Sequence, residues 1–198
     1  SSLLIDPPNG RMPAYTQQAQ ERLQAAAELR ASRGAFAGPE SRPLAERCLM
    51  SFGSSSGPPM LPILYNNHYQ IVQSPGYVMI LVEMVHDARI IRIDADPLPE
   101  AFRPWMGDSV AHWESDTLVV ETSRLNPSQK FRNATENFRI TERFTRVSDN
   151  VINYSFTAED PDTFAKPFSA EMPMKLTDDI LYEYACHEGN YSLPGVLA

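Results

Sequence analysis

The chain has 198 residues, of which 42% are apolar, and its 17 lysines and arginines face 25 aspartates and glutamates, a net charge of −8. This length and apolar content are typical of one globular domain with a buried core. The negative charge argues against nucleic acid and anionic membranes as partners, because both require clustered cations. No apolar run reaches the ~20 residues of a membrane-spanning helix.

The first sixty or so residues are predicted to form an N-terminal segment that precedes the main domain. Residues 1–13 contain prolines and are expected to be extended. Thr16 is a suitable N-cap for a helix over Gln17–Ser32, and Gly34 is a suitable residue to end it. The apolar stripe of this helix is thin, so we expect it to lie on the surface of another part of the molecule. Residues 35–62 predict a loop.

From about residue 65 the sequence predicts strand after strand, separated by short turns. The predicted strands are Tyr69–Gln73, Tyr77–His86, Arg89–Asp94, Ser109–Glu114, Thr117–Ser123, Asn137–Val147, Val151–Ala158, Phe168–Leu176 and Leu181–Cys186. An antiparallel meander of this kind closes into a barrel or folds into a sandwich. We therefore expect a mainly β fold: residues 63–198 form a lipocalin-like antiparallel β-barrel of about eight to ten strands, and residues 1–62 pack on it. An α+β cone with a curved sheet is the alternative.

The hairpin around residues 148–150 carries the most informative candidate residue. Its predicted register places Phe144 opposite Tyr154 and Glu142 opposite Phe156, so Glu142 shares a face with aromatic side chains. Burial of an ionised carboxylate costs several kcal/mol unless it is paired. We therefore expect Glu142 to have either a partner, such as a barrel arginine, or a raised pKa.

A second hairpin joins Tyr77–His86 to Arg89–Asp94 across a two-residue turn. Its predicted register places His86 opposite Arg89 at the mouth of the barrel. A cation beside an imidazole at the mouth of an apolar cavity is suited to carboxylate-bearing ligands. The structural alternative is that His86 bonds within its own turn. Exterior positions are expected for Glu83, Arg92, His112, Glu121 and Glu171.

These residues favour a cofactor-free enzyme that needs no metal: a lyase of the decarboxylase or dehydratase type, or an isomerase, acting on a small aromatic compound. The expected catalytic residues are His86, Glu142 and Tyr154. The expected substrate-binding residues are Arg89, Tyr184, Trp113, Trp105 and Phe156, although the aromatic ones are also typical core residues. One alternative is a periplasmic carrier with an apolar cavity and a structural Arg89–Glu142 pair. Another is an envelope-interaction protein that uses the N-terminal helix.

Cys48 and Cys186 have no C-x-x-C spacing, and the 4 histidines show no metal-binding pattern. The cysteines are therefore two buried thiols or one disulfide between the segment before the first strand and the last strand. We expect the disulfide if the protein is exported. The exposed helix and the edge strands would permit a homodimer.

Five segments are distinctive in combination: YNNHYQI (Tyr65–Ile71), VHDARIIRID (Val85–Asp94), WMGDSVAHWESDTLVVET (Trp105–Thr122), ENFRITERFTRV (Glu136–Val147) and YEYACHEGNY (Tyr182–Tyr191). Together they resemble a family of small exported bacterial proteins of unassigned function, common in sphingomonads and soil bacteria. The resemblance extends from IDPPNGRMP (Ile5–Pro13) to the end of the chain. It is weaker at HWESD (His112–Asp116) and TSRLN (Thr122–Asn126), where R-W-E-G-D and T-x-N-F-N are more common. The resemblance implies a periplasmic or secreted protein whose signal peptide has been removed, and it implies no activity.

Overall fold

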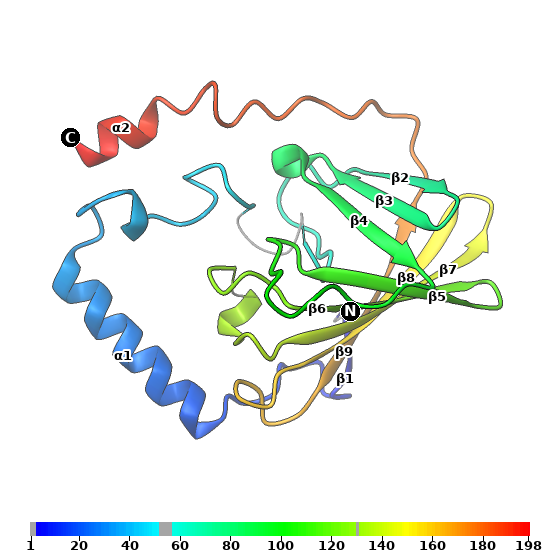
Figure 1. The fold of residues 1–198 in the computed structure, drawn as a ribbon, viewed down its shortest axis with the longest axis horizontal. Helices are drawn as coiled ribbons and strands as arrows, with labels where there is room; N and C mark the ends of the chain where they lie inside the picture. The colour runs from blue at the N-terminus through cyan, green and yellow to red at the C-terminus, as the bar shows by residue number, and fades with distance from the viewer. Residues whose placement is uncertain (1–2, 52–56, 130) are drawn as a thin grey trace.

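A single curled β-sheet forms the body of the protein in the computed structural model, which describes residues 3–51, 57–129 and 131–198 (Figure 1). Its strands are β1 (Leu4–Asp6), β2 (Tyr69–Ser74), β3 (Tyr77–Val82), β4 (Ala88–Ile93), β5 (Asp108–Glu114), β6 (Thr117–Ser123), β7 (Arg139–Ser148), β8 (Val151–Glu159) and β9 (Phe168–Lys175). They form one nine-stranded sheet in the order β1-β9-β8-β7-β6-β5-β4-β3-β2. The prediction of a mainly β fold is confirmed.

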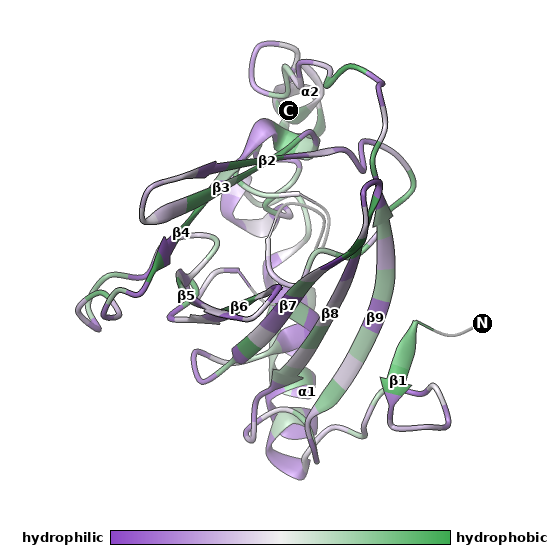
Figure 2. Ribbon diagram, turned by 90° about the vertical axis from the view of Figure 1, so that its right-hand side faces the viewer, coloured by the Kyte–Doolittle hydropathy of each residue, from purple (hydrophilic) through white to green (hydrophobic). Residues whose placement is uncertain are grey.

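The sheet curls around its core but does not close (Figure 2). Strands β1 and β2 are its two edges, and no strand pairing joins them in the described part of the chain. The closed barrel that the sequence predicted is therefore not observed. One of the nine strands is not a predicted one: β1, in the N-terminal segment, pairs with β9. The predicted strand Leu181–Cys186 does not form. Two contacts hold that segment instead: the Tyr182 backbone N–H donates to the Glu83 carboxylate, and Cys186 is disulfide-bonded to Cys48.

One strand pair departs from the predicted antiparallel meander. Strands β4 and β5 are parallel, with Ile91 opposite Ser109. The connection between them, residues 94–107, contains Pro97, Pro99 and Pro104 and carries the chain back to the end of the sheet from which β4 started. A return of this length is what a parallel pair requires, whereas a tight turn can join antiparallel strands only.

The tight hairpins have the predicted registers. Phe144 lies opposite Tyr154, and Glu142 lies opposite Phe156. Trp113 lies opposite Leu118 as expected. In both hairpins the short turn fixes the pairing, and the alternation of apolar residues fixes the buried face.

The β3–β4 hairpin has a different register from the predicted one. Strand β3 ends at Val82, and a 3-10 turn, η2 (Met84–His86), lengthens the loop, so that Arg89 lies opposite Ile80 and not opposite His86. The shift is by an even number of residues, and for that reason Arg89 keeps the interior orientation that was predicted for it. The exterior position expected for Glu83 is also wrong, because the longer loop leaves its side chain buried, while Arg92 binds Asp108.

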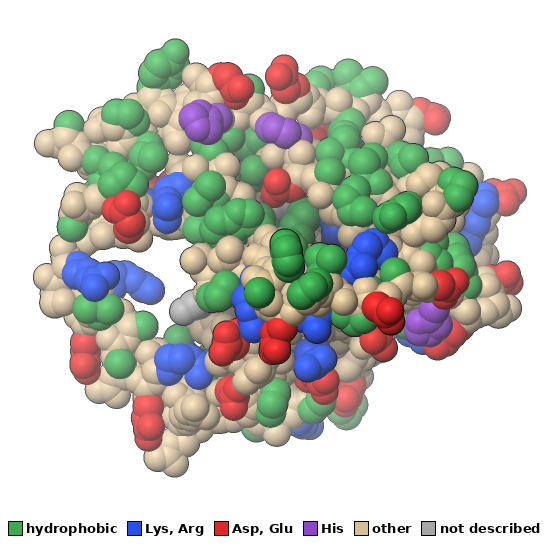
Figure 3. Space-filling model, in the orientation of Figure 1, with side chains coloured by type: hydrophobic (Ala, Val, Ile, Leu, Met, Phe, Trp, Pro, Cys, Tyr) green, Lys and Arg blue, Asp and Glu red, His purple; other side chains and the backbone are tan. Residues whose placement is uncertain are grey.

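Helix α1 (Gln17–Arg33) has the predicted boundaries within one residue, with Thr16 Oγ1 accepting the Ala19 N–H at 3.1 Å and Gly34 at the C-cap. Ala19 is its one buried residue, and Arg22 donates to the Thr163 hydroxyl at 2.8 Å. The rest of α1 stands away from the sheet (Figure 1), and the space-filling view shows a gap between them (Figure 3). The remaining helices are η1 (Pro39–Ser41), η3 (Phe131–Asn133) and the C-terminal α2 (Ser192–Leu197).

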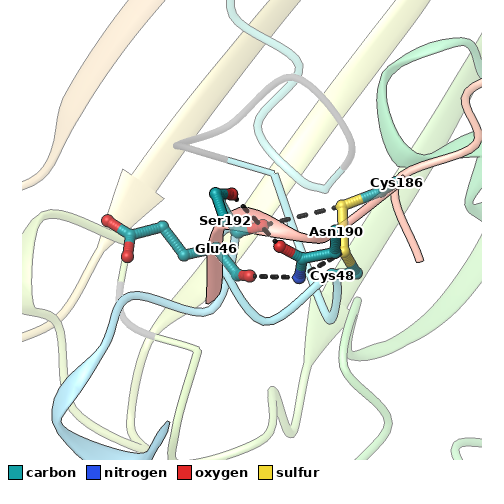
Figure 4. Close-up of a disulfide and its surroundings, with 6 residues drawn as sticks. Glu46, Cys48, Cys186, Asn190 and Ser192 are labelled. Atoms are coloured by element: carbon teal, nitrogen blue, oxygen red, sulfur yellow. Dashed lines mark hydrogen bonds between the residues drawn. A yellow bond between two sulfur atoms is a disulfide. The ribbon is translucent and has the colours of Figure 1, made fainter. Parts of the chain in front are cut away.

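The expected disulfide joins Cys48 to Cys186 across 138 residues of sequence (Figure 4). The Asn190 side chain supports this junction by donating to the Glu46 carbonyl at 2.8 Å. The segment that follows β9 is thereby tied to the segment that follows α1. None of the described helices is long and apolar enough to cross a bilayer.

Candidate functional site

A groove of about 820 Å³ occupies the concave side of the sheet, at the place where a closed barrel would have its seam. One wall comes from β2 and β3, and the other comes from β7, β8, β9 and the first residues after β9. In the described part of the chain, no strand joins edge strand β2 to the end of β9 that lies beyond its pairing with β1, and the groove lies between these two segments. Its volume lies within the 300–1,000 Å³ range of ordinary small-molecule sites.

Apolar side chains form most of the groove. The central ones are Ile71, Ile80, Leu118, Phe144, Met172 and Met174. They alternate along their strands with outward residues, which is why successive positions such as Ile71 and Val72 face opposite sides of the sheet. Trp113 lines the groove at its rim and is 47% exposed. A rigid apolar surface with an indole at its edge is suited to apolar or aromatic molecules.

Charged residues lie at one end of the groove, near the β5–β6 and β7–β8 turns. They are Asp116, Arg146, Asp149 and Lys175, two anions and two cations. Arg146 also lies 3.5 Å from Asp149 and donates to the backbone carbonyl of Ser148. This end therefore carries no net formal charge and does not select an ionic ligand by charge.

His68 and Tyr69 are polar residues of the groove at the start of β2. His68 Nδ1 lies 3.3 Å from Oε2 of Glu83, although the two atoms are not aligned as a hydrogen bond. The Glu83 carboxylate is buried, and its Oε1 accepts the Tyr182 N–H at 2.9 Å. Burial, with a smaller contribution from the negative charge of Glu142, raises the pKa of Tyr69 to about 12. Tyr69 is therefore a neutral phenol at physiological pH.

Beneath the groove lies a buried polar network around Arg89 and Glu142. Glu142 is 0% exposed and Arg89 is 3% exposed. The guanidinium binds the carboxylate with two prongs: Nη1 donates to Oε1 at 3.0 Å, and Nη2 donates to Oε2. Arg89 also donates to the hydroxyls of Ser109 and Thr122. The carboxylate thus has the partner that its predicted burial required.

Tyr154 completes the network from the neighbouring strand. Its hydroxyl donates to Glu142 Oε1 at 2.7 Å and accepts the Met60 N–H at 3.0 Å. Burial and the adjacent Glu142 charge raise the pKa of Tyr154 well above its ordinary value. The network takes one residue from each of β4, β5, β6, β7 and β8, so it cross-links the middle of the sheet.

The structure brings some of the predicted site residues together and separates others. Arg89, Glu142 and Tyr154 meet, but none of them lines the groove. Arg89 lies in the core and not at the predicted mouth of a barrel. His86 is exposed on η2, outside this buried network.

The aromatic candidates are divided in the same way. Phe156 is buried with its ring 6.0 Å from that of Tyr154, and Trp105 and Tyr184 pack against the edge of the core. Burial is also the main reason that the pKa of Tyr184 is raised. Trp113 is the one predicted binding residue that lines the groove.

The sequence reasoning missed His68, Glu83 and Tyr69 as a group. One signal was available, since His68 and Tyr69 lie in Tyr65–Ile71, a segment that carries the family resemblance. Glu83 gave no signal, because its burial depends on the C-terminal segment, whose Tyr182 N–H it accepts. No cluster of three or more metal-ligating side chains occurs in the part of the chain that the structure describes.

Comparison with known proteins gives no relative from which a function could be transferred. The chain matches no protein-family model, no curated protein and no solved structure. The groove and the buried network are therefore interpreted from their own chemistry.

Proposed function

We propose that the protein binds a small hydrophobic or aromatic molecule in the groove and carries or sequesters it without chemical change. The observation that carries this proposal is the groove itself, an 820 Å³ concavity lined mainly by apolar side chains of the curled sheet. Small antiparallel barrels use the same concave surface to hold one ligand. Here the open seam between β2 and β9 would serve as the entrance.

The position of the acidic group supports a carrier over an acid–base enzyme. A general acid or base must come within hydrogen-bond reach of the substrate. Glu142 is 0% exposed, its oxygens are bonded to Arg89 and Tyr154, and it does not line the groove. The geometry is therefore that of a structural ion pair below an apolar site. The lyase or isomerase hypothesis, with His86 and Glu142 as proton carriers, stays a prediction that this arrangement does not favour.

We also propose that the protein acts in an oxidising compartment outside the cytoplasm, such as the periplasm. The Cys48–Cys186 disulfide supports this location, because disulfides persist in oxidising compartments and are rare in the cytosol. The resemblance to exported bacterial proteins points the same way.

Titration with an uncharged fluorescent probe, N-phenylnaphthylamine, tests ligand binding directly. Saturable binding to one site is expected. Ile71→Arg places a cation on the groove wall and is expected to weaken binding at least tenfold, because an apolar ligand would then have to displace the water around a charge. Val72→Arg is the matched control: it is the next residue of the same exposed edge strand, but it faces the other side of the sheet. Its affinity should equal that of the wild type.

Absence of saturable binding, or equal losses in both arginine variants, would contradict a groove site. Mass spectrometry of bound compounds recovered from a mixture of small plant-derived aromatics separates the two functional classes. Recovery of a compound with unchanged mass supports a carrier, whereas recovery of a product that has lost carbon dioxide or water would support the lyase hypothesis.

A further inference from the structure

The pair formed by His68 and Glu83 gives the groove a directional hydrogen-bonding group. Glu83 lies behind the imidazole, with Oε2 at 3.3 Å from Nδ1. Its other oxygen is engaged by the Tyr182 N–H at 2.9 Å, which fixes the orientation of the carboxylate. His68 itself lines the groove and its side chain is 38% exposed. The backbone of the two residues is also joined, since the Glu83 N–H donates to the His68 carbonyl at 3.0 Å.

A carboxylate beside Nδ1 decides which nitrogen of a neutral imidazole carries the proton. The proton is most stable on the nitrogen that faces the negative charge, and the other nitrogen then presents a lone pair. Among the described residues, Nε2 of His68 has no hydrogen-bond partner, and it is not buried. Nε2 is therefore an acceptor that is available to a ligand in the groove.

Resting on the proposed function, we infer that the groove selects uncharged ligands that carry a hydroxyl donor, phenols above all, and that His68 Nε2 accepts this hydroxyl. An anionic ligand is disfavoured at this position, because a carboxylate there would face the buried Glu83 carboxylate across the ring. The aromatic surfaces of Trp113 and Phe144 in the same groove suit an aromatic body on the hydroxyl.

Calorimetric titration with three probes of one shape tests this inference: para-butylphenol, its methyl ether para-butylanisole, and para-butylbenzoate. At about pH 8 a free imidazole is uncharged and a free phenol keeps its proton. We expect the phenol to bind about three- to tenfold more tightly than the ether, which is the range of one net hydrogen bond, and the benzoate to bind most weakly.

Two variants locate the preference. His68→Phe should bind the phenol and the ether equally, with little change in affinity for the ether, whereas the exposed His112→Phe should keep the wild-type preference. Glu83→Gln is the sharper variant. Because the Tyr182 N–H requires an oxygen at the Oε1 position, the glutamine amide nitrogen would lie beside Nδ1 and place its positively polarised hydrogens there in place of a negative charge. The proton would then move to Nε2, and the preference for the phenol should disappear.

The outcomes distinguish this inference from the proposed function. Equal wild-type affinity for phenol and ether would overturn the hydroxyl selection while leaving a groove-binding protein. Retention of the preference in both His68→Phe and Glu83→Gln would place the hydroxyl elsewhere and would also overturn it. Failure of all three probes and of N-phenylnaphthylamine to bind would overturn both.

Discussion

Arg89 of β4 and Glu142 of β7 form a buried two-pronged ion pair in the interior of the curled sheet, 53 residues apart in sequence. Two strands lie between them in the sheet order, so the pair spans the concave side and does not run along a ladder. Ser109 and Thr122, one on each intervening strand, accept the remaining guanidinium hydrogen bonds. This arrangement cross-links four adjacent strands of the sheet through one guanidinium.

Glu142→Gln is expected to lower the free energy of unfolding by about 3–5 kcal/mol, because it leaves the Arg89 charge buried without a counter-ion. Urea unfolding of the purified variant measures this loss. The paired variant Arg89→Met with Glu142→Leu is the control, because replacing both members of a buried ion pair with apolar residues is often nearly neutral. A Glu142→Gln protein as stable as the wild type would show that the pair does not support the fold.

Tyr154→Phe is expected to cost about 1–3 kcal/mol of stability, since the Met60 N–H and one Glu142 oxygen both lose a partner in a buried site. Tyr77→Phe removes the same hydroxyl from a tyrosine that is 50% exposed and should be nearly neutral. Comparison of the two denaturation midpoints gives the result. Similar midpoints for both variants would contradict a structural role for the Tyr154 hydroxyl.

The disulfide is expected to contribute about 5 kcal/mol by restricting the unfolded chain, because it closes a loop with a separation of 138 residues. Cys48→Ser with Cys186→Ser measures this contribution, and intact mass with and without reductant establishes the bond through the gain of two hydrogen atoms. Hydrogen exchange in the variant should also increase at residues 176–198, which the bond ties down. An unchanged mass on reduction would show that the disulfide is absent.

Asp87 is expected to make the protein less stable at neutral pH than at acid pH. Burial, opposed in part by the His86 charge, raises the pKa of Asp87 from 3.8 to about 6. The folded state therefore holds this proton more tightly than the unfolded state. Its contribution to stability is complete below about pH 4 and is lost as the pH rises through about 6.

The variant Asp87→Asn should accordingly raise the thermal midpoint at about pH 7 and leave it nearly unchanged at about pH 4. Scanning calorimetry at the two pH values measures both effects. The exposed Asp178→Asn serves as the control and should shift neither midpoint. A lower midpoint for Asp87→Asn at neutral pH would show that the ionised carboxylate is stabilised in the fold.

The sequence determined those parts of the fold in which neighbours in the chain are neighbours in space. Thr16 and Gly34 marked the ends of α1, and the short turns fixed the β5–β6 and β7–β8 registers. From these registers it followed that Glu142 points inward and needs a partner. Alternation has a period of two, so Arg89 was assigned to the correct face even though its register was wrong.

Tertiary structure alone decided what depends on residues far apart in the chain. The opening of the sheet follows from two such contacts: β1 pairs with β9, and the C-terminal segment is held by Glu83 and Cys48 and does not become a strand. Neither contact has a local pattern. Tertiary structure also decided between a Glu142 that reaches the cavity and the Arg89–Glu142 pair of the carrier alternative, in favour of the pair. It placed His68, at the start of edge strand β2, on the wall of the groove. Local propensity and alternation fix which side of a strand is buried, but only the packing of distant segments fixes what lies against it.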